Sequence, residues 1–340
     1  MGKVILVVGG AGYIGSHMVL ALKDAGFIVV VFDNLSRGNW KAEDETNFFK
    51  GDLRFPEDID NCFSKYKFDL VMHFAAFAYV GESVLDPELY YQNNVLGTIN
   101  LLSSMRKFNL NKLVFSSTCA TYGEPTYLPV DEEHIQNPIN SYGRSKLMIE
   151  NILKDYFNAY QLQSISLRYF NAAGCDSLGR AGEFHDPETH LIPLVLLEAL
   201  RVKNGGNPKN SMLKIFGSDF ETKDGSCIRD YVHVEDICSA HLSAAKRLLK
   251  NETIGVEFFN LANGEGFSVF DVIAACQAVT GQSIEYQIAP RRVGDPAVLV
   301  GTANKALTFL DWNPKIMDLH KVIETAWISL CKEKKVNLHN

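Results

Sequence analysis

The glycine-rich stretch between residues 9 and 15 constrains the fold more than any other part of the sequence. Gly9, Gly12 and Gly15 recur every three residues, directly after the apolar run 3–8 and at the start of a helical pattern that extends to Ala25. The apolar run does not alternate with polar residues, which is typical of a strand buried in a parallel sheet. Glycines without a Cβ let the backbone approach a pyrophosphate at the positive end of a helix. The stretch therefore predicts a dinucleotide-binding βαβ unit.

The residues after this unit indicate which dinucleotide it binds. A second strand is expected over 28–32, and it ends at Asp33. An acid about 20 residues beyond the glycines suits the ribose hydroxyls and repels a 2′-phosphate, which favours NAD over NADP. Arg37 is the one feature that favours NADP instead. A third strand over 47–50 precedes Asp52, which is expected either to meet the adenine edge or to cap the next helix.

The later segments continue the alternation of strands and helices. Buried strands are expected over 69–73, 112–116, 164–168 and 257–261, and helices over 86–109, 191–200 and 269–280. This alternation predicts an α/β fold, a Rossmann-type doubly wound parallel sheet with a smaller C-terminal α/β domain. We expect the first domain to span 1–171 with a returning segment around 230–262, and the second to span 172–340. Asn93, inside the long helix, is expected to contact the cofactor or to face solvent.

A second motif, Tyr142-x-x-x-Lys146, carries the chemistry. Residues four apart lie on one face of a helix, about one turn from each other. An ammonium beside a phenol favours the phenolate, so we expect the Tyr142 pKa to fall towards the working pH, where the phenolate is a useful base. Thr118 ends a Ser/Thr run at the carboxyl end of a predicted strand, where its hydroxyl can bind a substrate alcohol.

Composition excludes several other classes of protein. The net charge of −7 argues against nucleic-acid binding through a general basic surface, and no apolar run is long enough to cross a membrane. Seven scattered cysteines without a Cys-x-x-Cys pair suit reduced thiols in a cytoplasmic protein. His185 and His190 suggest a metal site, but no carboxylate or cysteine cluster completes it in the sequence, so no metal is expected.

Several motifs together resemble one family. The chain resembles the extended short-chain dehydrogenases/reductases, and among them the UDP-glucose 4-epimerases and their UDP-arabinose/UDP-xylose 4-epimerase relatives. The resemblance covers nearly the whole length. It rests on Gly-Gly-Ala-Gly-Tyr-Ile-Gly (9–15), Asp33-Asn34-Leu35, Val80-Gly81-Glu82-Ser83, Ser116-Ser117-Thr118, Tyr142-x-x-x-Lys146, Arg168-Tyr169-Phe170-Asn171, Gly225-Ser226-Cys227-Ile228-Arg229-Asp230-Tyr231 and Arg291-Arg292-x-Gly294-Asp295.

The resemblance implies a 4-epimerase that interconverts UDP-glucose and UDP-galactose with bound NAD through a 4-keto sugar. It implies that Tyr142 is the base, that Thr118 holds the reacting oxygen and that Lys146 binds the nicotinamide ribose. The implied cofactor residues are Gly9, Gly12, Tyr13, Ile14, Gly15, Asp33, Asn34, Ser36, Asp52, Leu53, Phe74, Ala75, Ala76, Ala78, Asn93, Ser116, Tyr142, Lys146 and Phe170. The implied UDP-sugar residues are Thr118, Tyr142, Asn171, His190, Leu191, Phe216, Arg229, Arg292, Asp295 and Leu299.

Departures from the family pattern leave alternatives open. Ala78 stands where many members have lysine, and His190 replaces an asparagine that is common in galactose epimerases. Leu299 falls where residue size decides whether N-acetylated sugars enter, and leucine predicts weak turnover of UDP-GlcNAc at most. A UDP-arabinose/UDP-xylose 4-epimerase, a dehydrogenase that releases NADH and a non-catalytic NAD-binding regulator remain as alternatives. By analogy with the family, a homodimer is expected through helices over 86–108 and 141–160.

Overall fold

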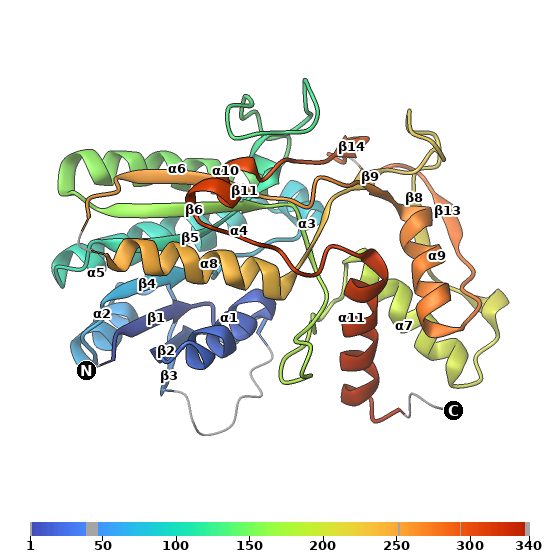
Figure 1. The fold of residues 1–340 in the computed structure, drawn as a ribbon, viewed down its shortest axis with the longest axis horizontal. Helices are drawn as coiled ribbons and strands as arrows, with labels where there is room; N and C mark the ends of the chain where they lie inside the picture. Colours follow the sequence, from blue (N-terminus) through green and yellow to red (C-terminus); the bar gives the residue numbers. More distant parts are fainter. Residues whose placement is uncertain (1, 39–46, 251, 293, 337–340) are drawn as a thin grey trace.

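The computed structural model describes residues 2–38, 47–250, 252–292 and 294–336 (Figure 1). Its centre is a parallel sheet of seven strands in the order β11-β6-β5-β4-β1-β2-β3. This arrangement confirms the predicted Rossmann-type doubly wound sheet. The strands of this sheet are β1 (Val4–Val8), β2 (Ile28–Asp33), β3 (Asn47–Lys50), β4 (Leu70–His73), β5 (Lys112–Thr118), β6 (Gln163–Tyr169) and β11 (Val256–Leu261).

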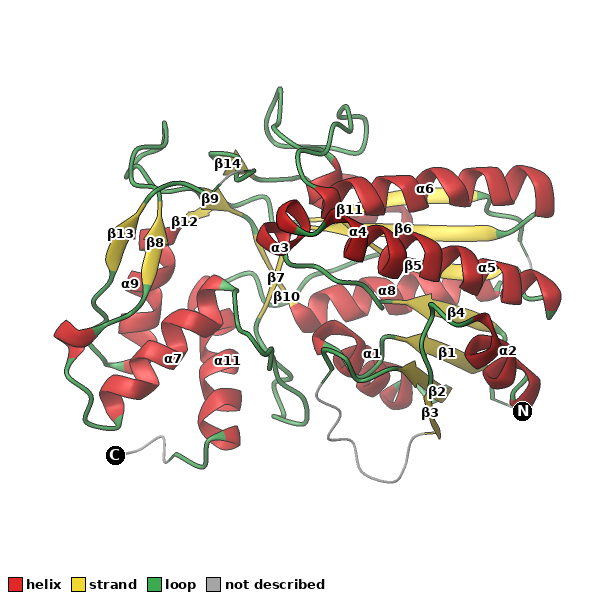
Figure 2. Ribbon diagram, turned by 180° about the vertical axis from the view of Figure 1, so that it is seen from behind, coloured by secondary structure: helices red, strands yellow, loops and turns green. Residues whose placement is uncertain are grey.

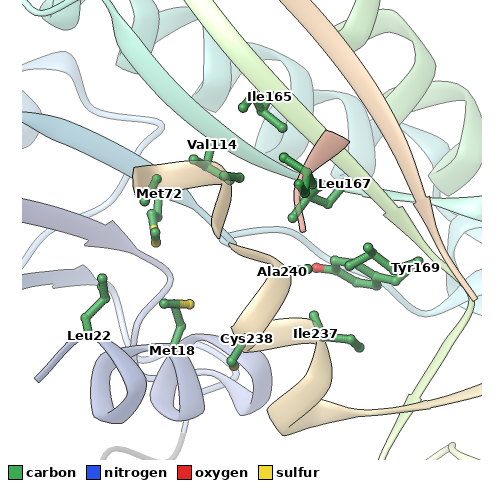
Figure 3. Packing of buried hydrophobic residues seen from close by; sticks show 14 of the residues in the cluster. Met18, Leu22, Met72, Val114, Ile165, Leu167, Tyr169, Ile237, Cys238 and Ala240 are labelled. Atoms are coloured by element: carbon green, nitrogen blue, oxygen red, sulfur yellow. The ribbon is translucent and has the colours of Figure 1, made fainter. Parts of the chain in front are cut away.

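Helices cover both faces of the sheet, because its inner strands are apolar on both sides. Helices α1 (Tyr13–Asp24) and α8 (Val234–Leu249) lie together on one face, and α2 (Pro56–Lys65), α5 (Gly97–Lys107) and α6 (Ser141–Tyr160) lie on the other (Figures 1 and 2). Figure 3 shows the core under the first pair, where Met18 and Leu22 of α1 and Ile237 of α8 meet the side chains of the sheet. Burial on both faces holds the carboxyl ends of the strands in fixed positions.

The predicted helix over 86–109 is a series of shorter segments. It consists of α4 (Pro87–Tyr90), a π-helical segment over Tyr91–Leu96 and then α5, and α3 (Val80–Leu85) precedes it. A π-helical turn offsets the side chains from the α-helical register, and such turns are frequent at functional sites. Asn94 lies in the π-helical segment and is fully buried, while its neighbour Asn93 faces the cavity described below. Of the two roles expected for Asn93, the structure supports the inward one rather than exposure to solvent.

The C-terminal part has its own core and stands beside the large sheet (Figure 1). Three small sheets and three helices, α7, α9 and α11, form it, and α10 returns to the edge strand β11. Helix α7 continues three residues beyond its predicted end, and α9 has the predicted bounds. The elements are β7 (Asn171–Ala173), α7 (Leu191–Lys203), β8 (Lys214–Phe216), β9 (Ile228–Arg229), β10 (Tyr231–His233), β12 (Phe267–Ser268), α9 (Val269–Thr280), β13 (Gln287–Ala289), β14 (Val298–Leu299), α10 (Asn304–Phe309) and α11 (Leu319–Glu333).

Two short 3₁₀ turns, Cys119–Thr121 and Pro208–Asn210, complete the secondary structure of the described residues. The polar tail expected to fray after residue 332 lies partly outside them, since residues 337–340 are not described. Among the described residues, no helix combines the length and apolar character that crossing a membrane requires.

Candidate active site

A cavity of about 410 Å³ opens at the carboxyl ends of the central strands, between the large sheet and the C-terminal part. In open α/β sheets this is where ligands bind. Of the residues predicted to bind the cofactor, Lys146 is the one that does not line the cavity. Those that do are Gly9, Gly12, Tyr13, Ile14, Gly15, Asp33, Asn34, Ser36, Asp52, Leu53, Phe74, Ala75, Ala76, Ala78, Asn93, Ser116, Tyr142 and Phe170.

The glycine-rich turn fits a dinucleotide pyrophosphate. A Cβ at Gly15 would collide with the carbonyl oxygen of Gly9, and Gly9 itself has φ 80° and lies tightly against Ala75. A Cβ at Gly12 would meet only the Gly9 carbonyl oxygen, at 3.4 Å, and Gly12 lines the cavity. Gly9 and Gly15 thus fold the turn tightly, and Gly12 leaves the start of α1 accessible to a phosphate group.

Asp33 and Arg37 lie in the arrangement expected of an NAD site. The Asp33 carboxylate accepts hydrogen bonds from the Ala11 amide at 3.0 Å and the Leu35 amide at 2.8 Å. Burial raises the pKa of Asp33, and these amides oppose the rise. Arg37, the residue that argued for NADP, forms an ion pair with Glu82 at 2.7 Å and lies over the ring of Tyr79 at 4.6 Å. Its charge is therefore already engaged within the protein.

Asp52 lines the cavity and does not cap the helix that follows it. Its carboxylate accepts hydrogen bonds from Asn34 Nδ2 at 3.0 Å and from Arg54 Nη2 at 2.6 Å. The N-cap of α2 is Phe55, which makes no side-chain cap. The capping alternative is therefore wrong, because the carboxylate is held by side chains next to the cavity.

Tyr142 and Lys146 lie on the first turns of α6, which Asn140 begins by accepting a hydrogen bond from the Gly143 amide at 2.8 Å. The Tyr142 side chain lines the cavity beside Thr118, whose hydroxyl hydrogen-bonds it. Lys146 is only 2% exposed and lies behind this wall, where its Nζ donates to the Ser116 carbonyl at 2.8 Å. The Nζ atom is 6.0 Å from the centre of the Tyr142 ring. The helix and strand β5 thus assemble the three predicted catalytic residues.

The expected fall in the Tyr142 pKa is wrong for the protein by itself. Burial raises the pKa of Tyr142 to about 12, and the hydrogen bond with Thr118 offsets only part of the rise. Burial also lowers the pKa of Lys146 to about 7, although the nearby carboxylate of Glu150 opposes this. The expectation rested on the ammonium beside the phenol. It left out the desolvation of both groups, which raises the pKa of Tyr142 and lowers that of Lys146.

The predicted substrate residues divide into two sets. Thr118, Tyr142, Asn171, His190, Arg229, Asp295 and Leu299 line the cavity, and Leu191, Phe216 and Arg292 do not. Arg229 reaches Asp295 at 3.4 Å, which places a cation and an anion together at the wall. The Arg292 guanidinium lies 3.9 Å from the centre of the Phe216 ring, so these two residues form a stacked pair of their own. The cavity is also lined by Phe77 and Tyr79, which flank the predicted Ala78, and by Glu183 and His185, which no sequence motif had placed there.

The sequence argument against a metal needs correction, because two glutamates complete the histidine pair. Glu183, His185, Glu188 and His190 each offer a ligand atom, and these atoms lie within 4.8 Å of one another. Burial raises the pKa of Glu183 to about 8. Burial works in the same direction at Glu188, but hydrogen bonds from the two histidines lower the pKa of that carboxyl to about 2. A compact loop rather than a sequence motif brings the four groups together.

The sheet, the glycine turn and the Tyr142–Lys146 pair define a nucleotide-binding protein of the extended short-chain dehydrogenase/reductase class. The model of the NAD dependent epimerase/dehydratase family matches residues 5–256. The chain belongs to this family.

Several proteins similar to the chain are named UDP-glucose 4-epimerase. UDP-glucose 4-epimerase of Halalkalibacterium halodurans is 50% identical over 323 residues, which cover 95% of this chain and 94% of that protein. The crystal structure of UDP-glucose 4-epimerase from Brucella ovis in complex with NAD is 43% identical, with a TM-score of 0.89, and the match covers 96% of this chain and 98% of that one. The Bifidobacterium longum enzyme in complex with NAD⁺ and UDP is 33% identical, with a TM-score of 0.91 and coverage of 98% and 99%.

Proposed function

We propose that the protein catalyses NAD-dependent 4-epimerisation of a UDP-sugar, with interconversion of UDP-glucose and UDP-galactose as the main reaction. One observation carries the proposal: a single cavity holds the glycine turn, Asp33, the Tyr142–Thr118 pair and the ion pair of Arg229 with Asp295. The names of the relatives, which are UDP-glucose 4-epimerases, support the same activity.

The glycine turn would hold the pyrophosphate of NAD, Asp33 would hold the adenosine ribose, and Lys146 would support the nicotinamide ribose. When bound, NAD supplies a hydride acceptor that is regenerated within each cycle. Tyr142 removes the proton from the sugar 4-hydroxyl and returns it to the same oxygen after the 4-keto sugar has turned over. Thr118 donates a hydrogen bond to that oxygen. Arg229 neutralises the diphosphate, and Asp295 accepts from a ribose hydroxyl.

The Tyr142→Phe variant tests the chemistry. We expect kcat to fall by about 10²–10⁴-fold, as for the loss of a general base, while NAD stays bound. Separate incubations with UDP-galactose, UDP-xylose and UDP-GlcNAc, followed by separation of the isomers, identify the sugar. Wild-type activity in Tyr142→Phe would contradict the proposal and favour the non-catalytic regulator. Accumulation of reduced nicotinamide in proportion to the substrate would contradict it and favour the net dehydrogenase.

A UDP-arabinose/UDP-xylose 4-epimerase is the second candidate. Its support is the pair of segments Ala78-Tyr79-Val80-Gly81-Glu82-Ser83 and Ser117-Thr118-Cys119-Ala120-Thr121-Tyr122-Gly123, which resemble those enzymes. Preferential conversion of UDP-xylose over UDP-galactose would favour it.

We also propose a cytoplasmic homodimer whose chains each have an NAD-binding domain over 1–171, with a returning segment around 230–262, and a nucleotide-sugar domain over 172–340. Seven free cysteines, six of them buried, support a reducing compartment. Exposed apolar side chains on the helices over 86–108 and 141–160 support the dimer: Leu96 is 46% exposed and Met148 is 40% exposed.

A further inference from the structure

Four metal-ligating side chains converge in the loop that precedes α7, at the wall of the main cavity. His190 Nδ1 lies 3.3 Å from Glu183 Oε1 and 2.9 Å from Glu188 Oε1. His185 Nδ1 lies 3.6 Å from Glu183 Oε1 and 3.3 Å from Glu188 Oε2. Each imidazole thus faces both carboxylates through the same kind of nitrogen.

These separations match the edges of a tetrahedral coordination site. Zinc binds imidazole nitrogen and carboxylate oxygen at about 2.0–2.2 Å, which puts neighbouring ligand atoms about 3.3–3.6 Å apart in a tetrahedron. Three of the four distances above lie in this range, and they join Glu183 Oε1, the two Nδ1 atoms and Glu188 Oε2. The fourth, 2.9 Å, runs from His190 to the other carboxylate oxygen of Glu188 and is a hydrogen bond beside the site. We propose that Glu183, His185, Glu188 and His190 bind one divalent transition-metal ion of the zinc type, which fastens this loop to the cavity wall.

Neighbouring groups hold the proposed ligand side chains in position. The Glu188 carboxylate accepts hydrogen bonds from the amides of Thr189 at 2.7 Å and His190 at 2.8 Å. The ring of Tyr79 packs on both histidines, and its hydroxyl donates to the carbonyl of Pro187, inside the loop, at 3.1 Å. Partners that orient ligands in this way are a regular part of metal sites.

The charge and burial of the two glutamates also favour a bound metal ion. The side chains of Glu183 and Glu188 are only 5% and 9% exposed, and the ion-pair partners that the described part of the chain gives them are His185 and His190. Two buried carboxylates that share no permanent cation are costly unless a cation joins them. The mixed nitrogen and oxygen ligands favour zinc, cobalt or nickel over magnesium or calcium, which prefer oxygen alone.

The test uses the purified full-length protein after dialysis against a chelator. Titration with Zn²⁺ is expected to show one equivalent bound with a Kd in about the micromolar range or below, and Co²⁺ is expected to give the intense visible absorption of a tetrahedral complex. Glu183→Gln and His185→Asn should each weaken Zn²⁺ binding by about 100-fold. His320→Asn is the matched control, because His320 also lies near a carboxylate, that of Asp318, but outside the cluster; its affinity should equal that of the wild type.

The wild-type measurements decide the matter even if a cluster variant fails to fold. Absence of stoichiometric binding, an octahedral Co²⁺ spectrum, or wild-type affinity in folded Glu183→Gln would overturn the proposal. The readouts are metal binding and spectra, so the result is independent of whether the enzyme acts on UDP-sugars.

Discussion

At the residue scale, the burial of the Lys146 ammonium lowers the stability of the folded protein. Its ammonium is almost fully buried with the Ser116 carbonyl as its hydrogen-bond acceptor, and burial lowers its pKa to about 7 from 10.5. Between these two pH values the unfolded chain binds more protons than the folded protein. The free energy of unfolding therefore rises with pH through this window, and the cost of burying the charge is fully present below it.

We therefore expect Lys146→Met to stabilise the protein while it removes activity. At pH 7 and below, the gain should be about 1–2 kcal/mol, since an apolar side chain of similar length replaces a buried charge. The gain should shrink as the pH rises from 7 towards 10.5. Urea unfolding of both proteins at several pH values measures it, and a constant difference across this range would contradict the assigned pKa shift.

At the same scale, we expect Leu299 to limit the size of the sugar that the cavity admits. Its side chain is 7% exposed, lines the cavity and packs in a small cluster with Cys119, Tyr122 and Phe170. Leu299→Ala should raise kcat/KM for UDP-GlcNAc by about tenfold or more, because the space for an N-acetyl group grows. Turnover of the two substrates, UDP-GlcNAc and UDP-galactose, is measured side by side. Fast conversion of UDP-GlcNAc by the wild type would show that leucine is no barrier.

At the scale of elements, Asn94 joins three parts of the site. From the π-helical segment, its side chain accepts from the Phe77 amide at 2.8 Å and donates to the Phe77 carbonyl at 3.0 Å and to Ser145 Oγ at 3.1 Å. It therefore fixes the cavity-lining segment around Phe77 and connects it to α6, which carries Tyr142.

Asn94→Ala should lower the free energy of unfolding by about 2–4 kcal/mol, because it leaves the two buried backbone groups of Phe77 without partners. NAD affinity should fall as well, since Phe77 and Ala78 line the cavity. Asn158→Ala, an exposed position on α6, is the control and should change neither quantity. Unfolding curves and NAD titration check both. Loss of NAD affinity without loss of stability would mean that Asn94 acts on the ligand directly.

The elements also show what the sequence could predict. Buried strands without alternation and the glycine turn were sufficient for the seven-stranded sheet and for most of the cofactor residues, because both signals are local. The π-helical segment was missed because the sequence pattern indicates one long helix and contains no local signal for the change of register. The Glu183–His190 cluster was missed because a loop without periodicity forms it. The Tyr142 pKa was wrong because desolvation depends on the whole fold.

At the scale of the whole molecule, exposed apolar side chains on α3, the π-helical segment and α6 form the surface at which we propose that two chains meet. Leu85 is 86% exposed, Leu96 46% and Met148 40%, and α6 packs against both α3 and the π-helical segment, so these residues belong to one side of the sheet. A homodimer with two-fold symmetry would bury the same patch on both chains. The interface would then lie directly behind Tyr142, on the outer side of the helix that positions it.

We expect the double variant Leu96→Glu, Met148→Glu to be a monomer, because four buried like charges would meet across a two-fold axis. Light scattering after size exclusion should show the mass of two chains for the wild type and of one for the variant. Leu178→Glu is the matched control, since Leu178 is 71% exposed in a loop outside these helices; it should stay dimeric. A wild type that is monomeric at all concentrations, or a variant that stays dimeric, would contradict this interface. If the dimer stiffens α6, the monomer should also lose epimerase activity while it retains its fold by circular dichroism.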